Sequence, residues 1–282
     1  MLQSGDFTDD DQDYYPLHKH QRTKRQAVRR PRLTEYVEGE ERGDAFSMTY
    51  QPARYEEGWL RGSLRNFYAE HLISDVLAQV KGGKEASVYR CAAHARMGMG
   101  LLAAKVYRPR MFRNLRNDKA YKQGRPTLTG EGRPVKETDQ RLMRALGKKT
   151  ALGVQIEHTS WLMYEYTTLQ RLYEAGGDVP QPIAAGDNAI LMSYHGDEHR
   201  AAPTLNEVSL TDAEAPRLFD AILRNIELML QHGLIHGDLS AYNILYWEGA
   251  ITIIDFPQAV DPRTNRNAEA LLRRDVENVC RY

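Results

Sequence analysis

The stretch Leu234–Phe256, LIHGDLSAYNILYWEGAITIIDF, constrains this chain more than any other segment. Two apolar runs, 243–246 and 251–254, flank a turn that contains glycine, so they are predicted to pair as strands. Such a unit brings a loop carboxylate, an asparagine and a strand-ending carboxylate together at one end of the hairpin. These residues are Asp238, Asn243 and Asp255. Hard oxygen ligands of this kind suit Mg²⁺, which also needs phosphate oxygens to complete its shell. The stretch therefore predicts phosphoryl transfer from a nucleotide.

Length and composition set broad limits. A chain of 282 residues can form one large domain or two modest ones around a substantial core. Lys plus Arg and Asp plus Glu are both 38, so net charge gives no global steering. Cys91 and Cys280 lack metal-ligand spacing and are interpreted as reduced thiols. The sequence has no apolar run of about 18 residues and no apolar signal core at its start, so we expect a cytoplasmic protein.

Residues 1–56 differ from the rest of the chain. Acidic, basic and again acidic blocks follow one another, and few apolar residues recur at any period. This composition predicts a disordered charged tail. An electrostatic arm for RNA or for an acidic partner is the alternative.

The next segment predicts a small sheet with helices. A short amphipathic helix is expected over 56–69, and a second helix over 161–175, where Gly176 and Gly177 would end it. The expected strands are 73–80, 86–91, 101–107 and 189–194. The turn Lys81–Glu85 contains two glycines and could lay backbone N–H groups over phosphates, although such a hairpin more often means only a turn.

Two charged residues stand on apolar faces of these elements. Lys105 follows Leu101–Ala104 inside an apolar strand, where burial is costly unless the ammonium meets an anion. Glu165 lies on or near the apolar stripe of the helix 161–175 and needs a cation in turn. We therefore predict a Lys105–Glu165 ion pair.

The segment 107–150 is strongly basic. It has thirteen Lys and Arg against four Asp and Glu, with Phe112 and Tyr121 interleaved. Prolines and glycines predict a flexible centre, and a helix is expected over 138–147. Binding of an RNA backbone and a solvated loop that contacts ATP or the acidic tail remain equal alternatives.

The order of these features matches the parts of a phosphoryl-transfer site. A long helix over 212–233 precedes the opening stretch, capped by Thr211 or Asp212 and by Gly233. Lys105 would hold the α- and β-phosphates, and Asp238 would orient or deprotonate the attacking hydroxyl. Asn243 and Asp255 would hold Mg²⁺. His236 is interpreted as a structural histidine that supports the loop.

Several motifs resemble the RIO family of atypical Ser/Thr protein kinases, as a bacterial or archaeal type of member nearest the first RIO subfamily. They are Gly83–Tyr89, Lys105–Tyr107, Trp161 with Glu165 and Leu169, the string HGDLSAYNILY, and IIDFPQAV. The segment Met111–Arg116 is similar to the flexible loop of that family. The resemblance covers roughly 73–261, and its most specific part is HGDLSAYNIL.

The resemblance implies an α+β fold, a compact two-lobed protein-kinase-like domain. Its N-lobe would be an antiparallel sheet plus a helix, over about 57–194, with a basic flexible insertion at 108–150. Its truncated helical C-lobe would span about 195–282. Together these make a RIO-type kinase domain at 57–282.

The resemblance also implies the activity and its cofactors. The implied activity is that of a non-specific Ser/Thr protein kinase that acts on another protein or on itself. The implied cofactors are ATP with Mg²⁺ or with Mn²⁺. ATPase turnover through an aspartyl phosphate at Asp255 is a further implication. The implied nucleotide-contacting residues are Lys105, Glu165, Gly83, Lys84, Val88, Met192 and Tyr194. Lys81–Glu85 replaces the Ser-Thr-Gly-Lys-Glu turn of the family, so the hydroxyls are lost. The linker after Met192 also lacks the expected acidic residue.

Two other functions stay open. One is an RNA-binding or ribosome-binding assembly factor switched by nucleotide, with ribosomal RNA or a ribosomal subunit as partner of 108–150. The other is a small-molecule phosphotransferase of the aminoglycoside-kinase type, which generally carries a large helical domain after its metal-binding Asp. Only 27 residues follow Asp255, so neither that domain nor ordinary docking of an extended peptide is expected.

Overall fold

The computed structural model describes residues 46, 48–108, 123–136, 138–148 and 150–282. Its first part is a five-stranded antiparallel sheet with the strand order β1-β2-β3-β5-β4. The strands are β1 (Ile73–Gly82), β2 (Ala86–Ala93), β3 (Leu101–Tyr107), β4 (Pro182–Ala185) and β5 (Ala189–Ser193). The sheet confirms the strands expected from the sequence and adds β4, a short strand that sequence reasoning missed.

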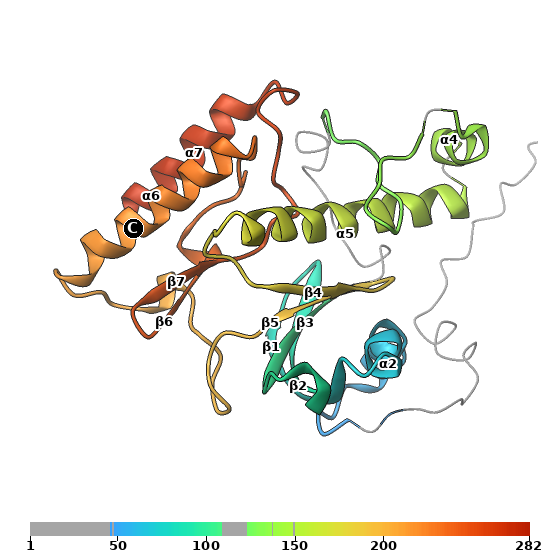
Figure 1. Cartoon of the computed structure of the whole chain (residues 1–282), viewed down its shortest axis with the longest axis horizontal. Coiled ribbons are helices and arrows are strands. Elements are labelled where there is room, and N and C mark those ends of the chain that lie inside the picture. Colours follow the sequence, from blue (N-terminus) through green and yellow to red (C-terminus); the bar gives the residue numbers. More distant parts are fainter. Residues whose placement is uncertain (1–45, 47, 109–122, 137, 149) are drawn as a thin grey trace, which may run out of the picture.

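The two faces of this sheet are covered by different helices (Figure 1). Side chains alternate along a strand, so Leu102, Ala104 and Val106 of β3 face one way. They pack with α2 (Arg54–Ala69) in one apolar cluster. Tyr107 and its neighbours on the opposite face pack with α5 (Ala151–Glu174) in another. Lys105 therefore projects from the α5 side of the sheet.

Helix α5 is ten residues longer at its start than the sequence predicted. The Thr150 hydroxyl accepts a hydrogen bond from the Gly153 N–H at 3.2 Å and caps the helix. The preceding helix, α4 (Gln140–Gly147), confirms the helix expected near 138–147 and packs closely on α5. A Cβ at Gly153 would lie 2.0 Å from the Ala145 carbonyl oxygen, so only glycine permits this approach.

The second part of the fold is mainly helical. It contains α6 (Glu214–Gln231), the hairpin of β6 (Ile244–Trp247) and β7 (Ala250–Ile253), and α7 (Ala268–Arg281), which sequence reasoning missed. Leu218, Ile222, Ile226 and Met229 of α6 are buried in a common core with the end of α5. The buried face of α6 thus ends at Met229, while the next apolar residue, Leu230, is exposed. Helix α5 joins the cores of both lobes.

The start of the folded region differs from the expected boundary at residue 56. Phe46 and Met48 are already buried in the cluster under α2, and the Tyr50 N–H donates to the Val76 carbonyl at 2.8 Å. Residues 1–45 of the tail predicted over 1–56, and residues 109–122 of the basic insertion, lie outside the described residues. None of the helices in the described part of the chain combines the length and the apolar composition that crossing a bilayer requires.

Candidate active site

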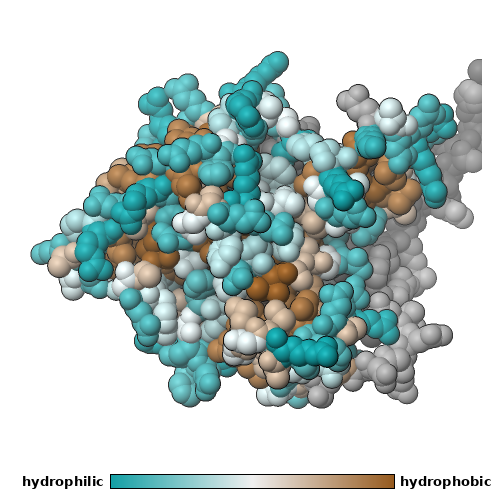
Figure 2. Space-filling view, viewed as in Figure 1, coloured by the Kyte–Doolittle hydropathy of each residue, from teal (hydrophilic) through white to brown (hydrophobic). Residues whose placement is uncertain are grey.

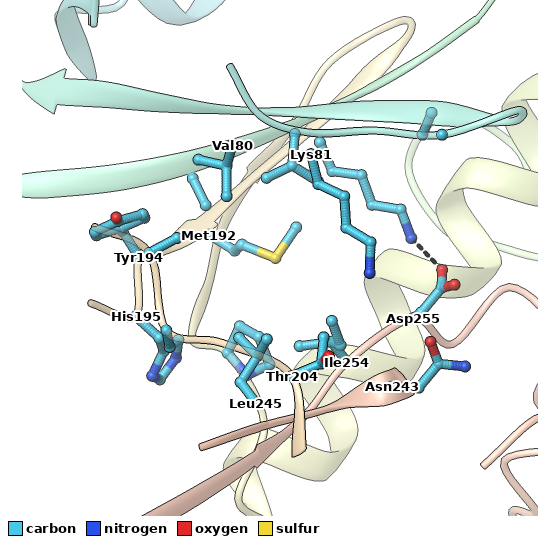
Figure 3. A pocket seen from close by; sticks show the side chains of 18 of the residues that line it. Val80, Lys81, Met192, Tyr194, His195, Thr204, Asn243, Leu245, Ile254 and Asp255 are labelled. Atoms are coloured by element: carbon cyan, nitrogen blue, oxygen red, sulfur yellow. Dashed lines mark hydrogen bonds and ion pairs between the residues drawn. The ribbon is translucent and has the colours of Figure 1, made fainter. Parts of the chain in front are cut away.

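A cleft of about 760 Å³ lies where the sheet meets the β6–β7 hairpin (Figure 3). Every site residue predicted from the sequence lines it except Asp238, which contacts the cleft-lining Asn243. The N-lobe lining residues are Gly83, Lys84, Val88, Lys105, Glu165, Met192 and Tyr194. The C-lobe contributes Asn243 and Asp255. The structure thus brings together residues that are up to 172 positions apart in the sequence.

Lys105 stands at the centre of the charged end of this cleft. Its ammonium lies 2.6 Å from Glu165 Oε1 and 2.6 Å from Asp255 Oδ1. Burial alone would lower the pKa of Lys105, but the charges of Asp255 and Glu165 raise it above its usual value. The Lys105–Glu165 ion pair predicted from the sequence is confirmed, and the pairing with Asp255 ties the N-lobe to the C-lobe.

Glu165 has a second partner that sequence reasoning missed. The Tyr107 hydroxyl donates to Glu165 Oε2, so both oxygens of this buried carboxylate are hydrogen-bonded. The Tyr107 ring is held edge-on by Trp161 at a centroid distance of 4.8 Å. A buried carboxylate is tolerated when its partners satisfy it, so this arrangement fixes the position of Glu165 and hence of Lys105.

Asp238 and Asn243 are held together by the loop between them. The Asn243 amide nitrogen donates to the Asp238 backbone carbonyl at 2.8 Å, with the Asp238 carboxylate at 3.5 Å. The amide oxygen of Asn243 is therefore the atom available as a ligand. Burial raises the pKa of Asp238, and the nearby charge of Asp255 raises it further while Arg274 opposes both. A raised pKa favours a group that must accept a proton.

His236 is a structural residue, as predicted. Its side chain is buried, with Nε2 at 3.1 Å from the Ile254 carbonyl and Nδ1 accepting the Asp238 N–H at 3.3 Å. Burial lowers the pKa of His236 to about 4, so the ring is neutral near pH 7. The neutral ring donates through Nε2 and links the Asp238 loop to the chain just before Asp255.

Asp255 has an unusual backbone conformation. Its φ is 73°, in the left-handed region that non-glycine residues seldom adopt. The Ile254 N–H donates to the Asn243 carbonyl at 2.9 Å and helps hold this turn. Burial opposes ionisation, but the charge of Lys105 holds the pKa of Asp255 below its ordinary value. The side chain remains 43% exposed, so one carboxylate oxygen faces the cleft while the other binds Lys105.

Asp275 of α7 is a second residue that sequence reasoning missed. Its carboxylate is buried and accepts the backbone N–H groups of Gly237 at 2.7 Å and Leu239 at 3.0 Å. Burial raises the pKa of Asp275 to about 6. The inward-facing series Leu271, Asp275 and Val279 was the available signal, because a carboxylate on a buried helix face needs donors. The fold supplies those donors from the loop around Asp238.

The Gly-containing turn Lys81–Glu85 is closed by a backbone hydrogen bond of its own. The Gly83 N–H donates to the Ala86 carbonyl at 2.9 Å, so this donor is used inside the hairpin. A Cβ at Gly83 would lie 2.7 Å from the Ala86 oxygen, which explains the glycine. The expected backbone cradle therefore lacks this N–H.

Beyond the turn, the linker carries a histidine that sequence reasoning treated as part of a linker only. His195 lies between the Ser193 hydroxyl at 3.3 Å and the Thr252 hydroxyl at 3.2 Å, so it joins β5 to the β6–β7 hairpin.

The side-chain oxygens of Asn243 and Asp255, which line the cleft, are hard donors that fit a divalent cation. Within the described ranges, no group of three or more His, Cys, Asp or Glu side chains is placed to hold a metal ion. Asn243 and Asp255 alone would offer few ligands, so phosphate oxygens would have to complete the shell. The site therefore suits a cation that arrives with a nucleotide.

The fold and this constellation define a two-lobed protein-kinase-like domain. The RIO domain model matches residues 87–282, and the chain belongs to the RIO family. The serine/threonine-protein kinase RIO1 of Chaetomium thermophilum is 33% identical over 225 residues, covering 76% of this chain and 40% of that protein. The RIO-type serine/threonine-protein kinase Rio1 of Haloferax volcanii is 34% identical over 123 residues, covering 44% and 41%. The chain thus spans about 40% of the length of these curated relatives.

Solved structures agree on the fold. The crystal structure of the Rio2 kinase from Chaetomium thermophilum has a TM-score of 0.52 and 25% identity, covering 80% of this chain and 61% of that one. The Rio2 kinase–ADP/Mg²⁺–phosphoaspartate complex from the same organism has a TM-score of 0.53 and 24% identity, covering 82% and 63%. The predicted kinase-like α+β fold is confirmed.

Proposed function

We propose that this protein is an ATP- and Mg²⁺-dependent serine/threonine protein kinase of RIO type that acts on another protein or on itself. The observation that carries this proposal is Lys105, held between Glu165 and Asp255 at 2.6 Å from each. This arrangement places a cation, two carboxylates and the Asn243 amide at the end of one cleft large enough for a nucleotide. Phosphoryl transfer depends mainly on such positioning and charge stabilisation.

The cleft supports a division of roles along its length. Val88, Met192 and Tyr194 form the apolar part that would take the base. Lys105 would meet the phosphates, and Asn243 and Asp255 would hold Mg²⁺, which supplies neutralisation of the charge on the phosphate oxygens. Mn²⁺ prefers similar oxygen ligands and is proposed as a substitute.

The proposed transfer is a single displacement at the γ-phosphorus. The oxygen of a Ser or Thr hydroxyl attacks the γ-phosphorus, and the bond from that phosphorus to the bridging oxygen of ADP breaks. The hydroxyl proton passes to the Asp238 carboxylate, whose pKa is raised by burial. Lys105 stays paired with Glu165 and keeps the phosphates in line.

Asp255 offers a second acceptor. Its free carboxylate oxygen could attack the γ-phosphorus and release ADP, giving an acyl phosphate that water then hydrolyses to free phosphate. The partial exposure of Asp255 supports this ATPase route. The solved complex of the Chaetomium thermophilum Rio2 kinase contains ADP, Mg²⁺ and a phosphoaspartate, which motivates the same proposal for this chain.

Incubation with γ-labelled ATP and Mg²⁺ tests these proposals. Wild type, Asp238→Ala and Asp255→Ala are compared for labelled protein and for released phosphate. Acid-stable label that disappears in Asp238→Ala supports Ser/Thr phosphorylation. Label removed by hydroxylamine and absent in Asp255→Ala supports an aspartyl phosphate. If wild type gives neither label nor free phosphate, the enzyme proposal fails.

We also propose that the basic insertion binds RNA, with ribosomal RNA or a ribosomal subunit as the partner class in the cytoplasm. Its described part exposes the cations Arg133, Lys136, Arg141, Arg144 and Lys148. Figure 2 shows hydrophilic side chains along the outer edge of the region that α4 occupies in Figure 1. Binding to ribosomal RNA should weaken steeply with salt. Arg141→Glu with Arg144→Glu should weaken it without changing ATP binding, and unchanged RNA binding would contradict the proposal.

A further inference from the structure

Lys81 is the last residue but one of β1 and lines the nucleotide cleft. It is paired across the strands with Val88, so its backbone is fixed by the sheet just before the Gly-containing turn. Figure 3 shows its ammonium pointing into the cavity, toward the side where Asp255 and Asn243 lie.

The charge balance at the phosphate end of the cleft leaves a role for this cation. Lys105 is already shared between the carboxylates of Glu165 and Asp255. The Gly83 N–H is used by the Ala86 carbonyl. A polyphosphate that enters this cleft therefore meets two groups whose donor capacity is largely taken. Besides Mg²⁺, Lys81 and Lys84 are the lysines that line the cleft together with Lys105, and each can add positive charge for the phosphates.

Lys81 has not been neutralised in the same way. Among the described residues, no carboxylate lies within ion-pair distance of its ammonium. Its charge nevertheless reaches Glu207, which lines the same cleft. Hydrogen bonds from Thr204 lower the pKa of Glu207 most, and the charge of Lys81 adds to this. Asn243 and Asp255, the proposed metal ligands, line the same cleft as this ammonium.

We propose that Lys81 is a phosphate-binding residue of this cleft, whose ammonium contacts the phosphate chain of a nucleoside triphosphate from the β1 side. It supplies positive charge that Lys105 cannot offer fully while it is paired with Glu165 and Asp255. This inference rests on the proposed ATP-dependent function and adds to it a binding residue on β1.

A phosphate-binding role has a specific consequence. Removing the Lys81 charge should weaken the binding of ATP and leave the binding of adenosine unchanged, because adenosine lacks the phosphates. A role in shaping the apolar part of the cleft would weaken both ligands together. The comparison of the two ligands therefore separates recognition of phosphate from recognition of the base.

Titration calorimetry of the full chain with Mg²⁺–ATP and with adenosine tests the proposal. Lys81→Met keeps the side-chain length and removes the charge, Lys81→Arg keeps the charge, and Lys148→Met removes an exposed lysine of the α4 end, outside the cleft. Lys81→Met should weaken ATP about tenfold, as expected for one charge-assisted contact. Lys81→Arg should restore most of this affinity, and Lys148→Met should match wild type.

The outcomes separate this inference from the function on which it rests. If Lys81→Met and wild type bind ATP equally, or if ATP and adenosine weaken by the same factor, the role of Lys81 is overturned. The proposed function then stands, provided that wild type binds ATP and transfers its label. If wild type itself fails to bind ATP, the proposed function falls, and this inference falls with it.

Discussion

The carboxylate of Asp275 in α7 accepts the backbone N–H of Gly237 at 2.7 Å, across 38 residues of sequence. Its other oxygen accepts the Leu239 N–H at 3.0 Å, so the two residues that flank Asp238 are held by one side chain. Asp275 lies outside the cleft and does not touch a substrate there. It is therefore a positioning residue, which fixes the loop that carries the proposed proton acceptor.

Asp275→Asn replaces one acceptor oxygen with an amide that cannot receive an N–H. We expect the loop to shift and label transfer from ATP to fall by about 10- to 100-fold, the cost of a small misplacement of a reacting group. KM for ATP should stay within about threefold, because the residues that line the cleft remain in place. Glu269→Gln, on an exposed position of the same helix, is the control. A rise in KM with unchanged kcat would contradict the positioning role.

Tyr107 is a second positioning residue, because it acts through its hydrogen bond to Glu165. Glu165→Gln removes one of the two anions that hold Lys105, so we expect label transfer to fall by about 100-fold or more, as for loss of a charged partner in a buried pair. Tyr107→Phe removes one hydrogen bond and should cost about 1 kcal/mol, or about fivefold in rate. Since Tyr107 acts through Glu165, the double variant should be no slower than Glu165→Gln alone. Additive losses would show that the two residues act independently.

The sequence was sufficient to predict the parts of the site that buried charge requires. Lys105 and Glu165 each stood on an apolar face, where an unpaired charge would be too costly. Asp238, Asn243 and Asp255 were grouped because a hairpin returns the chain to its starting point. In each case the physical constraint was local, or it needed only one partner of opposite charge.

Residues whose partners are backbone groups or distant hydroxyls could not be assigned in this way. Tyr107 at the end of an apolar strand has the pattern of an ordinary core residue, and only the packing of α5 brings Glu165 to its hydroxyl. Asp275 carried a signal on its helix face, but its partners are the N–H groups of a loop 36 to 38 residues away. Side-chain periodicity says that a partner is needed and does not identify it.

Element boundaries depended on packing in the same way. The start of α5 at Ala151 follows a segment rich in Lys and Gly, and there the structure places the Thr150 cap and the close approach of Gly153 to α4. Strand β4 has only four residues and begins with a proline, so only its pairing with β5 at the sheet edge defines it as a strand. Neither feature has a periodic signal of its own.

Phe46 tests the boundary of the folded region. Its ring is buried and stacks on Tyr68 at a centroid distance of 4.6 Å. Phe46→Ala should lower the free energy of unfolding by about 3 kcal/mol, because it leaves a cavity under α2. Tyr55→Ala, on the exposed side of α2, should change it by less than about 0.5 kcal/mol. Denaturant titration measures both. Equal small effects would return the boundary to residue 56, as the sequence suggested.

His236 predicts a pH dependence of stability with a defined sign. Burial lowers its pKa in the folded state to about 4 from an ordinary value of 6.5. Between these values the unfolded chain binds more protons, so the contribution of His236 is complete above pH 6.5 and is lost as the pH falls toward 4. The loss between pH 7 and pH 4 should be about 3 kcal/mol.

The measurement must separate His236 from Asp275. Burial raises the pKa of Asp275 to about 6, so that carboxyl favours the folded state increasingly as the pH falls over the same range. The wild-type curve is a sum of both effects. His236→Asn keeps an acceptor for the Asp238 N–H and does not titrate, so the difference between the wild-type and variant curves isolates His236. In urea titrations, the advantage of wild type over the variant should shrink by about 3 kcal/mol from pH 7 to pH 4. A difference that stays constant across this range would mean that the ring is not buried in its neutral form.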